Sequence, residues 1–426
     1  METPPTPEPD QRLEARARAV GAALAAALES ALGPLPERHR GPKLLGAALG
    51  CDKVLASRTL KALNQADPIA VLHAAPGPAP LRRVVQGAGR RGVDPAAVAS
   101  AEAAIEAFAA LIREGAGDRA ALGAMLSAWL PEAREEFELR RKQSAYRALA
   151  ELKGASMELD ISTTWLAPSA DGERIDVVWV NSFLGLARHV PRASVRFTSR
   201  RLGVTGSARQ PVTLDGAPIE GLAGVRLDGY CTAPPAPVAV QRAGDVVHYV
   251  LAADTFGPVA RYDLVYAEVN RAELPRAVPH GSGRRGYVYA DIAVPAKALV
   301  LDVFVHEDIY PAAAPELSIY DTAIGGIADV NDRSRDLDRL DLAETCRDLG
   351  RGLAHAAIPG APRYAALTEH VVARLGWSAA DFRHYRVQVE YPVYGSQVTL
   401  AFQAPEARPA STSSACGNGG GSASPE

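Results

Sequence analysis

The chain has 426 residues, a net charge of −3 and 47% hydrophobic residues, which is the composition of a globular protein with ordinary hydrophobic cores. Its length allows two or three domains. The four cysteines lie far apart without a CxxC pair, which excludes a dense disulfide framework and a cysteine-based zinc site and predicts reduced thiols.

The first residues, METPPTPEPDQR, are acidic and rich in proline, unlike the basic start of a signal peptide. The most apolar run near them, residues 20–28, is too short to span a bilayer. We therefore expect a cytoplasmic protein without membrane association, and we expect residues 1–9 to be disordered.

The first third of the chain has helical periodicity, beginning with a helix predicted over residues 10–32. The later helix starts are marked by an aspartate N-cap, a proline at the first helical position, or both. These starts are Asp67-Pro68, Asp94-Pro95, Asp118 and Pro131. The last helix ends at Gly154, so residues 10–154 are predicted to form an all-α domain.

Residues 42–64, PKLLGAALGCDKVLASRTLKALN, predict two short helices joined by a tight turn. Gly46 or Ala47 is the small residue expected where the helices cross. Gly50 is expected in the left-handed conformation of the turn, and Asp52 is expected to cap the second helix. This stretch resembles the DNA-reading motif of bacterial helix-turn-helix regulators.

The resemblance covers only these twenty-odd residues, and it departs from the family pattern in the second helix. Counting from the turn, the positions that usually bury Val or Ile and Ile or Leu hold Ala56 and Thr59. Leu55 and Leu60 stand one residue away on either side. A longer turn or a different helix crossing would accommodate them.

The resemblance implies that the second helix enters the major groove of double-stranded DNA, where arginine is the preferred reader of guanine. Basic residues before it and on a neighbouring helix predicted over residues 81–91 would hold the phosphate backbone. The predicted DNA-binding residues are Lys43, Lys53, Ser57, Arg58, Lys61, Arg82, Arg83, Arg90 and Arg91.

The distribution of charge supports this interpretation. From Arg38 to Arg91, ten basic residues stand against Asp52 and Asp67, a balance of +8. From Gly154 onward, 25 basic and 31 acidic residues leave a balance of −6. Such asymmetry is typical of a module that neutralises phosphates beside one that does not. The alternative is an ordinary helical hairpin whose lysines and arginines are only solvated.

After Gly154, apolar and polar residues alternate as in half-buried strands. Strands are predicted over residues 157–166, 174–180, 195–198, 246–252, 261–269, 287–294 and 299–306. Because few helices separate them, an antiparallel sheet or sandwich is favoured over a doubly wound fold. Two helices, over 340–349 and 363–375, are followed by a predicted hairpin of strands 385–391 and 397–403.

The predicted fold class is α+β. An N-terminal all-α domain that contains the helix-turn-helix is followed by a mainly antiparallel, β-rich domain over residues 155–404 with a few C-terminal helices. Residues 405–426 are polar and rich in Gly and Ser, and we expect them to be a disordered tail.

Three other kinds of motif are predicted to have structural rather than functional roles. GxGxxG occurs at residues 87–92 and 281–286, but neither follows a strand and precedes a helix, so a helix end and a hairpin loop are predicted. His306-Glu307-Asp308 ends a strand and is interpreted as a turn entry. Residues 329–341 lack the glycine and glutamate of a calcium loop and are expected to lead into the helix at 340.

These patterns lead to one main hypothesis, a DNA-binding transcriptional regulator whose C-terminal domain binds a small-molecule or protein effector. A homodimer is expected, since palindromic sites pair with two-fold symmetry. The alternative is a protein–protein interaction or scaffold protein without DNA binding. We predict no catalytic residue, cofactor or metal, and hence no enzyme.

Overall fold

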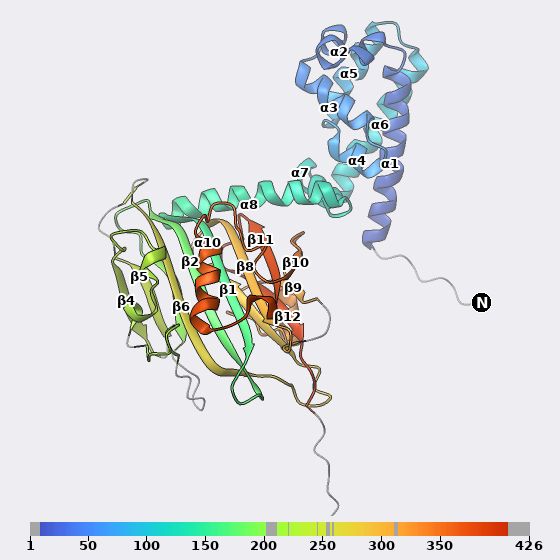
Figure 1. Cartoon of the computed structure of the whole chain (residues 1–426). Helices are drawn as coiled ribbons and strands as arrows, with labels where there is room; N and C mark the ends of the chain where they lie inside the picture. Colours follow the sequence, from blue (N-terminus) through green and yellow to red (C-terminus); the bar gives the residue numbers. More distant parts are fainter. Residues whose placement is uncertain are drawn as a thin grey trace, which may run out of the picture. The chain divides into compact units, whose positions relative to one another are not determined.

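The computed structural model describes residues 9–201, 211–219, 221–244, 246–252, 256–257, 260–310 and 314–407. It contains two compact units, one ending at Arg140 and the other beginning at Arg141. The first is helical and the second is mainly β-structure, which confirms the α+β class (Figure 1). The division falls inside helix α8 (Pro131–Lys153), whereas the sequence placed the domain boundary at its end.

Terminal disorder was predicted for residues 1–9 and 405–426, of which residues 1–8 and 408–426 lie outside the described residues. Pro9 already belongs to the first helix. Beyond residue 404, the backbone still pairs with Val278, whose N–H donates to Pro405 and whose carbonyl accepts from Ala407. The predicted start of the tail is therefore wrong for residues 405–407, because they form a short parallel bridge.

The helices of the first unit are α1 (Pro9–Leu32), α2 (Pro42–Leu49), α3 (Lys53–Leu63), α4 (Pro68–Ala74), α5 (Pro78–Arg90), α6 (Pro95–Leu111), α7 (Arg119–Ala128) and the start of α8, with short turns η1 (Pro36–Arg40) and η2 (Ile112–Ala116). The predicted N-caps are confirmed. The side chains of Asp52, Asp67, Asp94 and Asp118 each accept a backbone N–H from the first turn of their helix. These bonds satisfy donors that a helix start otherwise leaves unpaired.

The core of the helical unit is built around α1 and α6. Leu24 and Leu28 of α1 are fully buried in one cluster with Ile105 and Phe108 of α6. Residues 95–116 are long and apolar enough to cross a membrane by length and composition alone. Their apolar side chains contribute to this core, so we interpret the segment as the central helix of the helical unit.

The strands of the second unit are β1 (Ala155–Pro168), β2 (Arg174–Arg188), β3 (Val195–Arg201), β4 (Val238–Ala243), β5 (Val246–Leu251), β6 (Arg261–Pro275), β7 (Arg285–Asp291), β8 (Ala296–His306), β9 (Glu316–Asp321), β10 (Cys346–Arg351), β11 (Phe382–Glu390) and β12 (Ser396–Gln403). The helices are α9 (Leu222–Val225) and α10 (Tyr364–Leu375), with short turns η3 (Asp228–Tyr230), η4 (Arg333–Asp338) and η5 (Ala379–Asp381). The strands form a central six-stranded sheet of order β10-β11-β8-β1-β2-β6 and two three-stranded sheets, β7-β12-β9 and β3-β5-β4. Pairing is antiparallel as predicted, except between β1 and β8.

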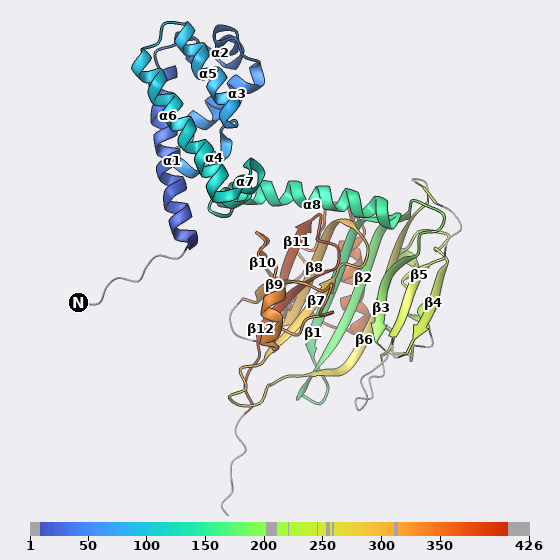
Figure 2. The ribbon, with the colours of Figure 1, turned by 180° about the vertical axis from the view of Figure 1, so that it is seen from behind.

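Both faces of the central sheet are covered. Because side chains alternate along a strand, Leu301 and Val303 of β8 pack against the β7-β12-β9 sheet while Phe304 faces α10. Figure 1 shows α10 over one face, and Figure 2 shows β7, β9 and β12 over the other. Trp165 is fully buried on the α10 side and stacks on Phe304 at 3.9 Å between ring centroids.

A buried ion pair ties β8 to its neighbours. Fully buried Asp302 accepts hydrogen bonds from Arg386 of β11 at 2.6 and 2.7 Å and from the Tyr364 hydroxyl of α10 at 2.8 Å. His384 Nε2 lies 3.2 Å from the same carboxylate. Although burial acts to raise the pKa of Asp302, Arg386 and His384 outweigh it and lower that pKa. Arg386 also donates to two backbone carbonyls before α10, so the network fixes that segment on the sheet.

Two predictions in the C-terminal region are wrong. Residues 340–349 contain no helix. Leu340 N–H donates to Ile319 O at 2.8 Å, and β10 begins at Cys346 and pairs with β11. Strand pairing at the sheet edge supplies the backbone partners that a helix would have supplied. Residues 329–341 therefore lead into an extended segment through η4.

The second correction concerns the predicted hairpin. Strands β11 and β12 exist, but β11 pairs with β8 and β10, while β12 pairs with β7 and β9. The connection between them, which contains Tyr391 and Gly395 at positive φ, crosses from one sheet to the other. Strands β4 and β9 were not predicted at all.

Candidate functional site

The helices and turn predicted over residues 42–64 are present. Gly50 ends α2 in the left-handed conformation (φ 69°, ψ 35°), and Asp52 accepts the Leu55 N–H at 2.8 Å. A Cβ at Gly46 would lie 2.8 Å from the Cys51 carbonyl oxygen, so only glycine permits this close approach of α2 to the turn. Of the two candidate small residues, Gly46 is therefore the one at the contact.

The positions that depart from the family pattern are buried all the same. Ala56 and Thr59 are both fully buried, and the Thr59 hydroxyl donates to the Leu55 carbonyl at 2.9 Å. Leu55 is also buried, whereas Leu60 is only partly so. The buried face of α3 therefore includes the small side chains of Ala56 and Thr59 together with Leu55.

The opposite face of α3 is exposed and polar. Lys53, Ser57 and Lys61 follow one another at intervals of four residues, which places them on one line along the helix. Val54 beside them is 68% exposed, an unusual position for this residue type. Sequence patterns did not single out Val54, because exposure of one apolar side chain has no local signal.

Two of the predicted arginines, Arg83 and Arg90, lie beside these helices, and a third, Arg58, belongs to α3 itself. Arg83 is close enough to Cys51 to lower its pKa, although burial and Asp52 raise that pKa overall. Arg90 donates to the Leu49 carbonyl at 3.3 Å. Both residues belong to α5 and lie near the turn. Arg58 is exposed but donates to the Ala75 carbonyl at the end of α4 at 3.4 Å.

The remaining predicted residues are spread more widely. Arg82 forms an ion pair with Glu106 of α6, and Arg91 forms one with Glu37 of η1 at 2.9 Å. Lys43 is exposed in the first turn of α2. The structure therefore groups Lys53, Ser57 and Lys61 along α3 and Arg83 and Arg90 near its preceding turn, and it engages Arg82 and Arg91 elsewhere.

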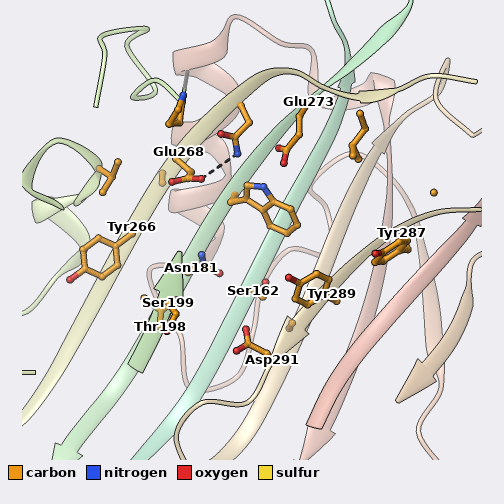
Figure 3. A pocket seen from close by; sticks show the side chains of 18 of the residues that line it. Ser162, Asn181, Thr198, Ser199, Tyr266, Glu268, Glu273, Tyr287, Tyr289 and Asp291 are labelled. Carbon is orange, nitrogen blue, oxygen red and sulfur yellow. Dashed lines mark hydrogen bonds between the residues drawn. The ribbon is translucent and has the colours of Figure 1, made fainter. Parts of the chain in front are cut away.

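A second site was not predicted. In the β-rich unit, a cleft of about 800 Å³ has strands β1, β2 and β6 as its floor and residues of β3, β5 and β7 along its sides (Figure 3). Ser162, Asn181 and Tyr266 are register partners on the three floor strands, so they share one face of the sheet. The alternation in β1 predicted a half-buried strand. Both faces of β1 are buried instead, because the segments around the cleft cover the face that carries the polar residues.

Two carboxyl groups in the cleft have perturbed acidity. Asp160 is only 5% exposed, and burial together with the charge of Asp291 raises the pKa of Asp160 well above its usual range. Asp291 is exposed and lines the cleft, and desolvation by the surrounding protein raises its pKa. A backbone hydrogen bond and the charge of Arg196 act in the opposite direction. Unusual acidity in a cleft is a feature of functional sites.

Asp160→Asn is expected to be more stable than the wild type, by a margin in the free energy of unfolding that increases as pH rises. The folded pKa exceeds the ordinary value of 3.8, so the folded state binds the extra proton and wild-type stability falls while pH rises toward the folded pKa. Asparagine cannot ionise, so its advantage grows over that window by about 1.4 kcal/mol per unit of pKa shift. Urea unfolding at several pH values measures this difference, and Glu390→Gln, which removes an exposed carboxyl group, is the control. An advantage independent of pH would contradict the assignment.

The His306-Glu307-Asp308 motif lies outside both sites, whereas the two GxGxxG segments contribute Arg90 beside the turn before α3 and Arg284 and Arg285 to the lining of the cleft. Glu307 forms an ion pair with Arg351 at 2.5 Å, and the Asp308 N–H donates to His306 Nδ1 at 3.2 Å, as in a turn entry. None of these three residues of β8 and its turn lines the cleft. The first GxGxxG segment ends α5, and the second precedes β7, where Arg285 pairs with Glu316.

Comparisons of the chain with protein-family models, with curated proteins and with solved structures find no match. The exposed face of α3 and the cleft over β1, β2 and β6 are therefore the two features from which a function is inferred.

Proposed function

We propose that the protein binds double-stranded DNA through α2 and α3 and acts as a transcriptional regulator whose β-rich unit binds an effector. The observation that carries the proposal is the exposed line of Lys53, Ser57 and Lys61 on a helix that follows a left-handed glycine turn. In a helix-turn-helix, the start of the second helix faces the major groove.

The residues around this line suit the same role. Val54 offers an exposed apolar side chain for a thymine methyl group. In this proposal Arg83 and Arg90, beside the turn, contact phosphates on one side of the groove. Arg58 is exposed despite its bond to Ala75, so its remaining N–H groups are available to the backbone on the other side.

The double variant Lys53→Ala/Lys61→Ala is expected to bind DNA at least about tenfold more weakly, because two phosphate contacts are lost. The slope of log affinity against log salt concentration should also become shallower by about two. Fluorescence anisotropy of labelled duplex fragments of mixed sequence over a salt series measures both quantities.

The matched control is Arg16→Ala/Arg113→Ala, which removes the same charge from the helical unit. These arginines pair with Glu114 at 2.6 Å and Glu106 at 3.0 Å, away from α3. The control should keep its affinity within a small factor. Equal loss in both variants, or no salt-dependent binding by the wild type, would contradict the proposal. The absence of co-purified nucleic acid together with no binding would favour an interaction or scaffold protein.

The proposal includes a homodimer. Bacterial regulators of this type read two half-sites about 34 Å apart, one helical turn of DNA, with one α3-type helix for each. The effector would occupy the β-rich unit, whose cleft has the size of a small-molecule site.

A further inference from the structure

The floor of the cleft contains polar side chains that lack protein partners. Asp160 and Ser162 of β1 are only 5% and 6% exposed, and Asn181 of β2 is the register partner of Ser162. Within the described part of the chain, the carboxyl, hydroxyl and amide groups of these three residues form no hydrogen bond or ion pair. The Tyr266 hydroxyl of β6 is also buried without a partner there. Buried polar groups are normally hydrogen-bonded, so this group of side chains points to a ligand or to water.

The charged side chains of the lining are engaged or offset. Besides Asp160, they are Glu268, Glu273, Asp291, Arg284 and Arg285. Both glutamates have partners within the protein. The two arginines pair with carboxylates outside the lining. The charge of a nearby arginine opposes that of Asp291. A charged ligand would leave water and gain little from this lining, so the cleft does not favour one.

The unpartnered groups of the floor share one chemical property, which is that each can both donate and accept a hydrogen bond. Burial and the nearby charge of Asp291 raise the pKa of Asp160, which favours its uncharged carboxyl form. An uncharged carboxyl group, a hydroxyl group and a primary amide each contain a donor and an acceptor. A ligand hydroxyl donates and accepts through one oxygen, so it can pair with any of them. An apolar ligand would leave them without partners.

Aromatic rings lie beside these polar groups. Trp179 lines the cleft and stands two residues before Asn181 on β2, so the two side chains share one face of the sheet. Tyr289 of β7 lines the side of the cleft, and Figure 3 shows it with Ser162 and Asn181. A sugar ring carries hydroxyl groups around its edge and C–H groups on its faces, and the C–H groups can pack on the apolar surface of an aromatic ring.

We propose that this cleft binds a neutral carbohydrate. Sugar hydroxyl groups pair with the side chains of Asp160, Ser162 and Asn181, and one face of the sugar ring lies on Trp179. The cleft volume of about 800 Å³ is within the range of small-molecule sites. A planar ring that carries an amide group also donates and accepts hydrogen bonds, and the choice of probes separates it from a sugar.

The test uses the full chain without DNA and the methyl pyranosides of glucose, galactose, mannose and xylose in both anomeric forms. Tryptophan fluorescence and calorimetry near neutral pH give the dissociation constants. At least one methyl pyranoside is expected to bind saturably with a dissociation constant below about 10 mM. Four comparison probes are expected to bind at least about tenfold more weakly: the uronic acid and the 2-amino sugar of the same series, cyclohexanol and nicotinamide.

The double variant Ser162→Ala/Asn181→Ala is expected to weaken sugar binding at least about tenfold. Because neither side chain forms a hydrogen bond within the described protein, its removal breaks none in the fold, and urea unfolding should confirm an unchanged stability. Asp160→Asn should keep the affinity within about fivefold, since the amide still donates and accepts. Ser378→Ala removes an exposed hydroxyl outside the cleft and should bind the sugar normally.

Four results would each overturn the proposal. They are no saturable binding of any methyl pyranoside up to about 50 mM, tighter binding of a comparison probe than of every methyl pyranoside, unchanged affinity in Ser162→Ala/Asn181→Ala, and a larger loss than about fivefold in Asp160→Asn. The inference rests on the proposed function only in assigning the sugar as the effector. It is measured without DNA, whereas the DNA assay is performed without sugar, so either proposal can fail while the other holds.

Discussion

Asp302→Ala is expected to lower the free energy of unfolding of the β-rich unit by about 3–5 kcal/mol, the range for breaking a buried ion pair. The variant leaves the Arg386 guanidinium, which is only 5% exposed, without its carboxylate. It also removes the acceptor of the Tyr364 hydroxyl, so α10 loses a bond to the sheet. Urea unfolding followed by tryptophan fluorescence measures the change, since Trp165, Trp179 and Trp377 all lie in this unit.

The matched control is Glu307→Ala, which breaks an ion pair with Arg351 at the exposed end of the same strand. Exposed pairs contribute about 0–1 kcal/mol, so this variant should stay near the wild type. The pKa of Asp302 is lowered in the fold, so its stabilising effect is present above the unfolded pKa and is lost as pH falls through the folded pKa. The deficit of Asp302→Asn should therefore shrink in acid. Equal effects of Asp302→Ala and Glu307→Ala would show that the buried pair contributes little.

Gly87→Ala is expected to destabilise the helical unit by about 1–3 kcal/mol, the range for overpacking. A Cβ at Gly87 of α5 would overlap the Leu49 carbonyl oxygen and lie 3.0 Å from its carbonyl carbon, and this backbone cannot move without displacing the turn after α2. DNA affinity should fall as well, because that turn positions α3. Thermal unfolding by far-ultraviolet circular dichroism and the anisotropy assay measure the two effects.

Gly89→Ala, on the same helix, provides the control. A Cβ there would make only ordinary contacts with Val98, the nearest at 3.6 Å. Alanine should then stabilise α5 by up to about 1 kcal/mol through helix propensity. If both variants behaved alike, the contact of Gly87 with Leu49 would not hold α5 against α2. The first GxGxxG segment would then be no more than the helix end that its sequence suggested.

The helices of the first unit could be predicted because the start of each helix depends on the chemistry of a few neighbouring residues. Asp67 and Asp94 each cap a helix whose next residue is proline, and these preferences act over two or three residues. Strand positions in the β-rich unit were also largely predicted. Their partners were not, because pairing joins residues far apart in the chain, such as Leu159 of β1 and Ala298 of β8.

The cleft could not be predicted for a related reason. Asp160 and Ser162 occupy the polar positions of an alternating strand, which in most antiparallel sheets face solvent. Only the placement of β7 and β3 over that face makes it an interior surface, and no local pattern records this. The failure at residues 340–349 has the same origin, since pairing of Cys346 with Val387 decides the conformation there.

The floor of the cleft also determines how its specificity could change. Ser162, Asn181 and Tyr266 lie opposite one another on three paired strands, so their attachment points form a row with a spacing of about 4.8 Å across the strands. The next residues on the same face follow about 6.7 Å further along each strand, which extends the row to a lattice. Backbone hydrogen bonds hold this lattice regardless of which side chains it carries. Exchanging a single side chain would therefore alter one point of contact and leave the others in place, so new ligands could be accommodated one substitution at a time.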